Sequence, residues 1–180
     1  MNDAFVIPLK RFDLAKERLR VDNAHAVTEL AEQLATGVIV SCRPRHTIVL
    51  SESDEITQFA SALDCEVVRS DARDLNGAVQ GAYGALQSRF DRLIIVHGDL
   101  AHPEGLGTFN PGDGITIVTD HRGLGTNVMA IPTGLDFHFT YGVDSALLHQ
   151  REAERLGCPL TVVTDSPWRY DVDEPGDLER

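Results

Sequence analysis

The residues with the clearest chemical meaning stand near the start of the chain. Pro8-Leu9-Lys10-Arg11-Phe12 opens a cationic stretch, and Lys10 and Lys16 are the only two lysines among the 180 residues. Together with Arg18 they place ammonium groups and a guanidinium fork close together, as the binding of a polyphosphate requires. The alternative is a solvated surface loop. The stretch therefore predicts either a phosphate-binding loop or ordinary charged surface.

Aspartates suited to a divalent cation occur at two later points. Asp99 follows the apolar run Leu93–Val96, and Asp171-Val172-Asp173 lies near the end of the chain. Magnesium is commonly held by one or two carboxylates together with substrate phosphates, so these aspartates predict metal-assisted phosphoryl or nucleotidyl transfer. For Asp173 the competing interpretation is a helix cap before Pro175. The histidines show no spacing typical of metal ligands.

A glycine turn and a later helix start are candidates for binding a second anion. The turn is Gly123-Leu124-Gly125-Thr126-Asn127, and Gly142-Val143-Asp144-Ser145 opens a helix. Backbone amides in such a turn and at a helix start attract a phosphate or a carboxylate, and the hydroxyls of Thr126 and Ser145 would complete the site. The alternative is that Asp144 or Ser145 simply caps the helix.

These residues need secondary structure that brings them together. Apolar runs predict strands at 4–8, 47–50, 66–68, 93–96, 115–118, 128–131 and 160–163. The 3.6-residue period predicts helices at 54–63, 75–88 and 144–156, a helix from Ala24 that either ends at or includes Gly37, and a short helix after Pro175. Alternating strands and helices predict an α/β three-layer sandwich on a mainly parallel, mixed sheet. Such sheets bind ligands at the carboxyl ends of their strands, where the candidate residues fall.

Composition restricts the class of protein. A length of 180 residues with 42% hydrophobic content is enough for one core, so we expect a single domain over residues 1–180. The net charge of −12 disfavours nucleic acid and anionic membranes as partners, although residues 1–20 carry a net charge of +2. Three widely spaced cysteines without a CxxC pair, and no apolar segment of about 20 residues, predict a soluble, cytoplasmic protein.

Taken together, these segments resemble one family, the guanylyltransferases of coenzyme F420 biosynthesis, which activate phosphoenolpyruvate or 2-phospholactate with GTP. The likeness spans about residues 4–178. It is carried by Ile7–Lys10, Ala15–Leu19, Asp74-Leu75-Asn76, Gly98-Asp99-Leu100, Asp120–Asn127, Gly142-x-x-Ser145 and Asp171–Pro175. The resemblance implies a nucleotidyltransferase fold, like that of molybdopterin guanylyltransferases and nucleotide-diphospho-sugar transferases.

The resemblance also assigns candidate roles. It implies a magnesium ion at Asp99, Asp171 and Asp173, and the acid substrate at Thr126, Gly142 and Ser145. We assign the triphosphate of GTP and the leaving pyrophosphate to Lys10, Lys16 and Arg18, with Asn76 as a further nucleotide contact and with Lys10 and Asp99 as the catalytic residues. The expected reaction is in-line attack of a substrate phosphate oxygen on the α-phosphorus of GTP. It needs no general base, because a phosphate monoester is largely ionised at neutral pH.

Several alternatives stay open at this stage. The acceptor is a small phosphorylated carboxylic acid, namely phosphoenolpyruvate, 2-phospholactate or 3-phosphoglycerate, and the family resemblance favours phosphoenolpyruvate. Rival functions are a nucleotidyltransferase that uses CTP or UTP or acts on molybdopterin, and a non-catalytic nucleotide-binding domain. A glycosyltransferase is the least favoured, because 180 residues leave little room for a sugar-acceptor region. The oligomeric state stays open.

Overall fold

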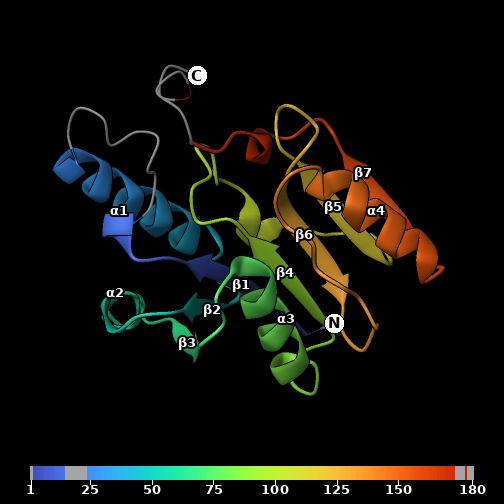
Figure 1. The fold of residues 1–180 in the computed structure, drawn as a ribbon, viewed down its shortest axis with the longest axis horizontal. Helices are drawn as coiled ribbons and strands as arrows, with labels where there is room; N and C mark the ends of the chain where they lie inside the picture. The colour runs from blue at the N-terminus through green and yellow to red at the C-terminus, as the bar shows by residue number, and fades with distance from the viewer. Residues whose placement is uncertain (1, 15–23, 173–176, 178–180) are drawn as a thin grey trace.

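A computed structural model describes residues 2–14, 24–172 and 177 (Figure 1). Within these residues one sheet has the strand order β3-β2-β1-β4-β6-β5-β7. The strands are β1 (Asp3–Leu9), β2 (His46–Ser51), β3 (Glu66–Arg69), β4 (Arg92–Val96), β5 (Ile115–Thr119), β6 (Thr126–Pro132) and β7 (Leu160–Val163). The helices are α1 (Ala24–Ser41), α2 (Asp54–Ala62), α3 (Leu75–Leu86) and α4 (Ser145–Arg155).

Strand β6 runs against the rest of the sheet. It is antiparallel to β4 and β5, whereas β1 is parallel to β2 and β4, β2 is parallel to β3, and β5 is parallel to β7. The mainly parallel, mixed sheet predicted from the sequence is therefore confirmed. The reversal matters for the site, because the amino end of β6 lies at the edge where the other strands have their carboxyl ends.

Helices cover both faces of the sheet, and alternating residues of each strand feed two cores. In β1, Ala4 and Val6 pack in one core with α3, while Phe5 and Ile7 pack in the other with α1. Figure 1 shows α3 and α4 in front of the sheet. All five residues of β4 are buried, as expected for a central strand covered on both faces. Each fully buried large aliphatic side chain contributes about 1.5–3 kcal/mol, so the two cores fix the strand register.

Two expected helix ends have different outcomes. Helix α1 continues past Gly37 to Ser41, because Val38 and Ile39 are buried and pack against the sheet. Gly37 is therefore an interior glycine of this helix. The short helix expected after Pro175 lies outside the described residues. Within the described part of the chain, no helix has the length and apolar character needed to span a membrane.

Candidate active site

A cavity of about 760 Å³ lies at the carboxyl edge of β1, β2 and β4. Its walls come from segments that directly follow these strands, together with the segment between β3 and α3; they include Lys10, Glu52, Ser70, Arg73, Asp74, His97 and Asp99. The volume is within the range of small-molecule sites. Because β1 and β4 are neighbours, Lys10 and Asp99 line the same cavity although 89 positions separate them.

The charges around this cavity are mixed. Lys10 and Arg73 face it together with the carboxylates of Glu52 and Asp74. The neighbouring Arg11 is engaged elsewhere, because its Nε donates to Asp13 Oδ1 at 3.0 Å, and this partner raises the pKa of the guanidinium. Lys10 is thus the cation of the predicted phosphate-binding loop that the structure places at the cavity. The predicted nucleotide contacts Lys16 and Arg18 lie outside the described residues.

The two described aspartates of the predicted metal site are joined by backbone pairing. Leu100 and Asp171 form an isolated antiparallel bridge, and the Val172 amide donates to the Asp99 carbonyl at 3.1 Å. The carboxylate of Asp171 accepts from Asn127 Nδ2 at 3.4 Å. Segments that are 72 positions apart in the sequence are therefore held side by side at the end of β4.

The chemistry of these side chains suits a magnesium ion, because Mg²⁺ typically takes one or two protein carboxylates and completes its shell with water and phosphates. Backbone pairing holds Asp99 and Asp171 on adjoining segments, and their sharing of one ion stays a prediction. Within the described residues no group of three or more metal-ligating side chains occurs. The third predicted ligand, Asp173, lies outside them.

The predicted acid-binding residues meet on the opposite side of β4. Thr126 begins β6, and Ser145 Oγ lies 3.4 Å from Thr126 Oγ1. The Ala146 amide donates to the Leu124 carbonyl at 2.9 Å, which fastens the start of α4 to the glycine turn. Both hydroxyl-bearing residues are 2% exposed, and neither of them lines the cavity.

The helix start has a specific backbone shape. Gly142 has φ +121°, a conformation that side-chain-bearing residues rarely adopt, and its carbonyl accepts from the Ser145 amide at 3.2 Å. Asp144 precedes α4 with φ +57° and its side chain makes no capping hydrogen bond. Asp144 therefore occupies the cap position, as one alternative expected, but without a side-chain hydrogen bond. Capping by Ser145 is wrong, because Ser145 is the first residue of the helix and its hydroxyl bonds Thr126.

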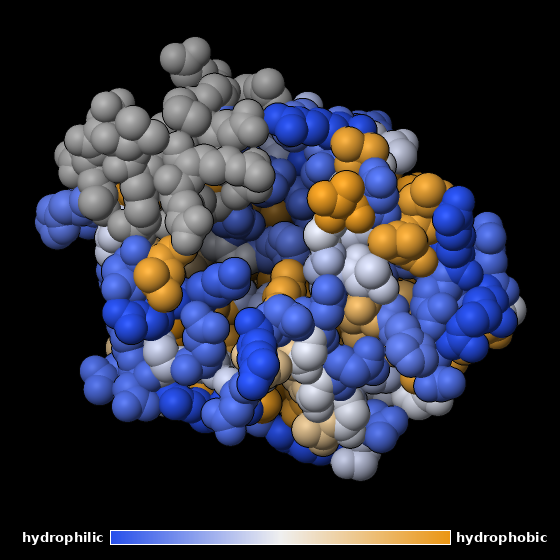
Figure 2. All heavy atoms as spheres, viewed as in Figure 1, coloured by the Kyte–Doolittle hydropathy of each residue, from blue (hydrophilic) through white to orange (hydrophobic). Residues whose placement is uncertain are grey.

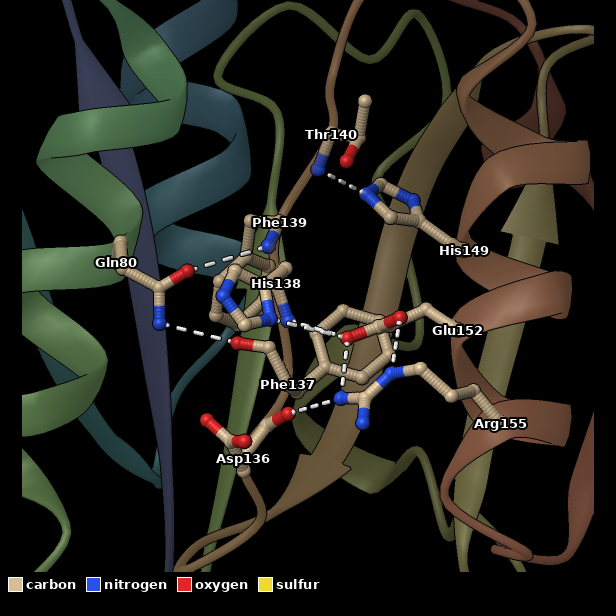
Figure 3. Close-up of polar contacts among 9 residues, drawn as sticks. All are labelled: Gln80, Asp136, Phe137, His138, Phe139, Thr140, His149, Glu152 and Arg155. Atoms are coloured by element: carbon tan, nitrogen blue, oxygen red, sulfur yellow. Dashed lines mark hydrogen bonds and ion pairs between the residues drawn. The ribbon is translucent and has the colours of Figure 1, made fainter.

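Asn76 has a structural partner in addition to its predicted role. Its Oδ1 accepts from the Tyr141 amide at 2.6 Å, and its Nδ2 donates to the Tyr141 carbonyl at 3.1 Å. One turn later on α3, Gln80 does the same with the Phe139 amide and the Phe137 carbonyl (Figure 3). Asn76 does not line the cavity. Its direct nucleotide contact stays a prediction, whereas its grip on the 137–141 segment is visible in the structure.

Helix α4 holds the same segment from the other side (Figure 3). His149 Nε2 accepts from the Thr140 amide at 2.9 Å, and Glu152 Oε1 accepts from the His138 amide at 3.0 Å. His149 was not among the predicted site residues. The spacing in the sequence could have indicated it. Residues four positions apart lie on one face of a helix, so His149 lies beside Ser145.

The glycine turn is fixed by a residue that the sequence analysis did not assign. The Arg169 guanidinium donates to the Asp120 carbonyl at 2.9 Å and to the His121 carbonyl at 2.9 Å. Hydrophobic groups gather on the surface over the start of α4 (Figure 2), where Leu124 is 52% and Val143 is 88% exposed. Arg169 therefore holds the backbone of the turn that precedes Thr126, and the exposed surface of this region is apolar.

Comparison with known proteins agrees with this geometry. A family model described as guanylyl transferase CofC-like matches residues 3–180. The chain belongs to this family. It is 29% identical to the phosphoenolpyruvate guanylyltransferase of Roseiflexus castenholzii, with 96% of this chain and 84% of the relative covered. It is 26% identical to the 2-phospho-L-lactate guanylyltransferase of Methanothermobacter thermautotrophicus, over 99% and 83% of the two chains.

Solved structures give the same fold for this guanylyl transferase family member. A crystal structure from Desulfovibrio desulfuricans G20, described as a nucleotide-diphospho-sugar transferase, superposes with a TM-score of 0.78. It is 15% identical and covers 98% of this chain and 84% of its own. This likeness shows the fold alone, and it confirms the predicted nucleotidyltransferase-like sandwich.

Proposed function

We propose that this enzyme transfers GMP from GTP to the phosphate of phosphoenolpyruvate and releases pyrophosphate, as a step of coenzyme F420 biosynthesis. The observation that carries the proposal is the family match over residues 3–180. The geometry supports it, because one edge of the sheet offers a nucleotide-sized cavity, two aspartates on adjoining backbone segments and a pair of hydroxyls. We also propose that residues 1–180 form one nucleotidyltransferase domain, since all seven strands described lie in a single sheet.

The reaction is a substitution at phosphorus. A phosphate oxygen of the acid attacks the α-phosphorus of GTP, a new P–O bond forms, and the bond from the α-phosphorus to the bridging oxygen breaks, so pyrophosphate leaves with both electrons. The chain must hold two repelling anions in line, and this is mainly a task of positioning and charge neutralisation. Lys10 at the cavity is assigned to the triphosphate and the leaving group, joined by Lys16 and Arg18. Thr126, Gly142 and Ser145 are assigned to the acid.

Asp99 and Asp171 would hold the magnesium ion, together with Asp173. When bound, Mg²⁺ neutralises phosphate charge and stabilises the charge that develops on transfer. The chain's own part is to fix these carboxylates. The Asp99 carbonyl receives the Val172 amide at 3.1 Å, and Asn127 donates to Asp171 at 3.4 Å. The proposal of a shared metal site is supported by Asp99, which lines the cavity, and by Asp171, which is hydrogen-bonded to Asn127 next to Thr126.

The acceptor is proposed from the names of the relatives and from shared chemistry. The relatives reported above act, by name, on phosphoenolpyruvate or on 2-phospho-L-lactate. These acids and 3-phosphoglycerate share a phosphate and a carboxylate and differ at the carbons between them. Such differences are worth about 1–3 kcal/mol in a small pocket, so discrimination needs a direct measurement.

The test combines a panel of nucleotides with a panel of acids. Purified protein is incubated with Mg²⁺, one of GTP, ATP, CTP or UTP, and one of the three acids, and pyrophosphate is measured. Coupling to the next enzyme of the pathway captures a labile guanylylated product. We expect pyrophosphate release only with GTP, and fastest with phosphoenolpyruvate.

Other outcomes have defined meanings. Turnover with CTP or UTP would overturn the choice of GTP. GTP binding without pyrophosphate release for any acid would show a non-catalytic nucleotide-binding domain. Faster turnover with 2-phospholactate or 3-phosphoglycerate would replace the acceptor and keep the reaction.

A further inference from the structure

A buried hydrogen-bond chain ends at the proposed acid-binding hydroxyl. It runs from the Thr140 amide to His149 Nε2 at 2.9 Å, and from His149 Nδ1 to Thr126 Oγ1 at 3.1 Å. His149 is 0% exposed and Thr126 is 2% exposed. Both ring nitrogens of His149 are therefore used, one on the backbone of the 137–141 segment and the other on Thr126.

The backbone contact decides where the ring proton lies. A main-chain N–H can only donate, so the His149 Nε2 that receives it carries no proton. In the neutral ring the proton is then on Nδ1, which donates to Thr126 Oγ1. Burial, and next the nearby His97, lower the pKa of His149 to about 4, so the ring is neutral at physiological pH.

The ring is also fixed in orientation. The Tyr141 ring packs against the His149 ring with centroids 4.9 Å apart, and the Phe137 ring lies 5.8 Å away. Gln80 and Asn76 hold the backbone of these aromatic residues from α3. Figure 3 shows Gln80 on one side of this segment and His149 on the other. The imidazole therefore has little freedom to rotate and exchange its two nitrogens.

This arrangement sets the direction of the Thr126 hydroxyl. Its oxygen accepts from His149 Nδ1 at 3.1 Å, and Ser145 Oγ lies 3.4 Å away as a second donor. A threonine hydroxyl has one proton, and an oxygen that already accepts must direct that proton to another group. An anion such as a carboxylate or a phosphate is the partner that gains most from a directed O–H.

We propose that His149 is a positioning residue that fixes the Thr126 hydroxyl as a hydrogen-bond donor to the acid substrate. The proposal rests on the assignment of Thr126 to the acid in the proposed function. His149 is fully buried and hydrogen-bonded to this hydroxyl, so it acts through Thr126. The Thr140 amide donates to Nε2 of His149, and this hydrogen bond selects the tautomer that carries its proton on Nδ1.

Two substitutions that introduce a side-chain amide test the roles of the two His149 ring nitrogens separately. The amide of His149→Asn reaches the position of Nδ1 and keeps a donor toward Thr126, but it loses the acceptor for Thr140. The amide of His149→Gln reaches the position of Nε2 and keeps that acceptor, but it loses the donor. We expect His149→Gln to raise the KM for the acid about tenfold with the KM for GTP unchanged, while His149→Asn keeps the KM for the acid near wild type.

A double-mutant cycle with Thr126→Val distinguishes failure of this inference from failure of the proposed function. If Thr126→Val leaves the KM for the acid unchanged, the substrate assignment of Thr126 is wrong. If Thr126→Val raises that KM and His149→Gln then raises it further by its full factor, the substrate assignment stands and the positioning role of His149 is overturned. We expect His149→Gln to have no further effect in the Thr126→Val background.

An NMR measurement tests the tautomer without any activity. Long-range ¹H–¹⁵N correlation spectra of the folded protein at neutral pH should show His149 protonated at Nδ1 and bare at Nε2. Protonation at Nε2 would overturn the inference whatever the kinetic constants show.

Discussion

The two sides of strand β4, which we propose bind GTP and the acid, differ in burial and in charge. On the β1–β3 side an open cavity of about 760 Å³ is lined by several charged side chains, Lys10 and Asp99 among them. On the β6 side Thr126, Ser145 and His149 are almost fully buried and bonded to one another. A large polyanion can be held by exposed charges in a groove, whereas a small acid is distinguished by a few fixed donors. On the proposed function, binding of the polyanion and selection of the acid would therefore depend on separate halves of one sheet.

The largest effect is expected where the two sides meet. Asp99→Asn removes a carboxylate from the proposed metal site while keeping the shape of the side chain. We expect kcat for pyrophosphate release to fall on the order of 100- to 1000-fold at saturating GTP and acid. Asp113→Asn, which changes an exposed carboxylate away from the cavity, is the matched control. Turnover close to wild type at saturating magnesium would show that Asp99 is not a metal ligand.

Burial of His149 should make the free energy of unfolding depend on pH. The pKa of His149 is about 4 in the folded protein and near 6.5 in the unfolded chain, so between these values the unfolded chain binds the extra proton. The free energy of unfolding is therefore highest above pH 6.5 and falls as the pH drops toward 4, by about 3 kcal/mol at most from this group. Urea denaturation at several pH values measures it. His149→Gln should show a shallower loss, and an equal slope in both proteins would contradict the burial of a neutral imidazole.

The open side should respond to charge and salt. Lys10→Ala removes the cation that the proposed phosphate-binding loop contributes to the cavity. We expect the KM for GTP to rise about tenfold, with the larger effect at low ionic strength. The KM for the acid should stay near wild type, because Thr126 and Ser145 do not line this cavity. Lys10→Arg keeps the charge and serves as the control. An increase confined to the KM for the acid would reverse the assignment of the two sides.

The smallest effect is expected far from both sites, at the amino end of β3. Arg89 Nη1 lies 2.6 Å from Glu66 Oε1 and His46 Nε2 lies 2.7 Å from Glu66 Oε2; Arg89 first, and then His46, lower the pKa of Glu66 to about 2. A lowered carboxylate pKa stabilises the folded protein above about pH 4.5, and this gain is lost as the pH falls through 2. Glu66→Gln should therefore cost less than about 1 kcal/mol at pH 7, and the difference from wild type should shrink toward pH 2. Altered kinetic constants in Glu66→Gln would show that the amino end of β3 is energetically coupled to the proposed active site.

Much of the fold was predictable because its signals are local. The run Leu93–Val96 is apolar throughout, and β4 is buried on both faces as that pattern predicts. The amphipathic pattern around 144–156 likewise predicted α4. The end of α1 could not be predicted from the sequence, because Gly37 is compatible with either the end or the interior of a helix. The helix continues past Gly37 because Val38 and Ile39 are buried.

The site was only partly predictable because its contacts are long-range. The positions of Lys10 and Asp99 after strands indicated one edge of the sheet, and they do line one cavity. No sequence pattern indicated that Asn76 would hold Tyr141 or that His149 would hold Thr140, since these partners are 65 and 9 positions away.

The sequence by itself determined the class of fold, the family and the residue types available for chemistry. These properties rest on local periodicity and on motifs whose members are neighbours in the chain. Only the tertiary structure decided that β6 runs against the other strands, which places Thr126 beside Ser145 and His149. The physical reason is that strand order and direction are set by packing of two cores over the whole sheet, and hydrogen bonds between distant residues form only once that packing is complete.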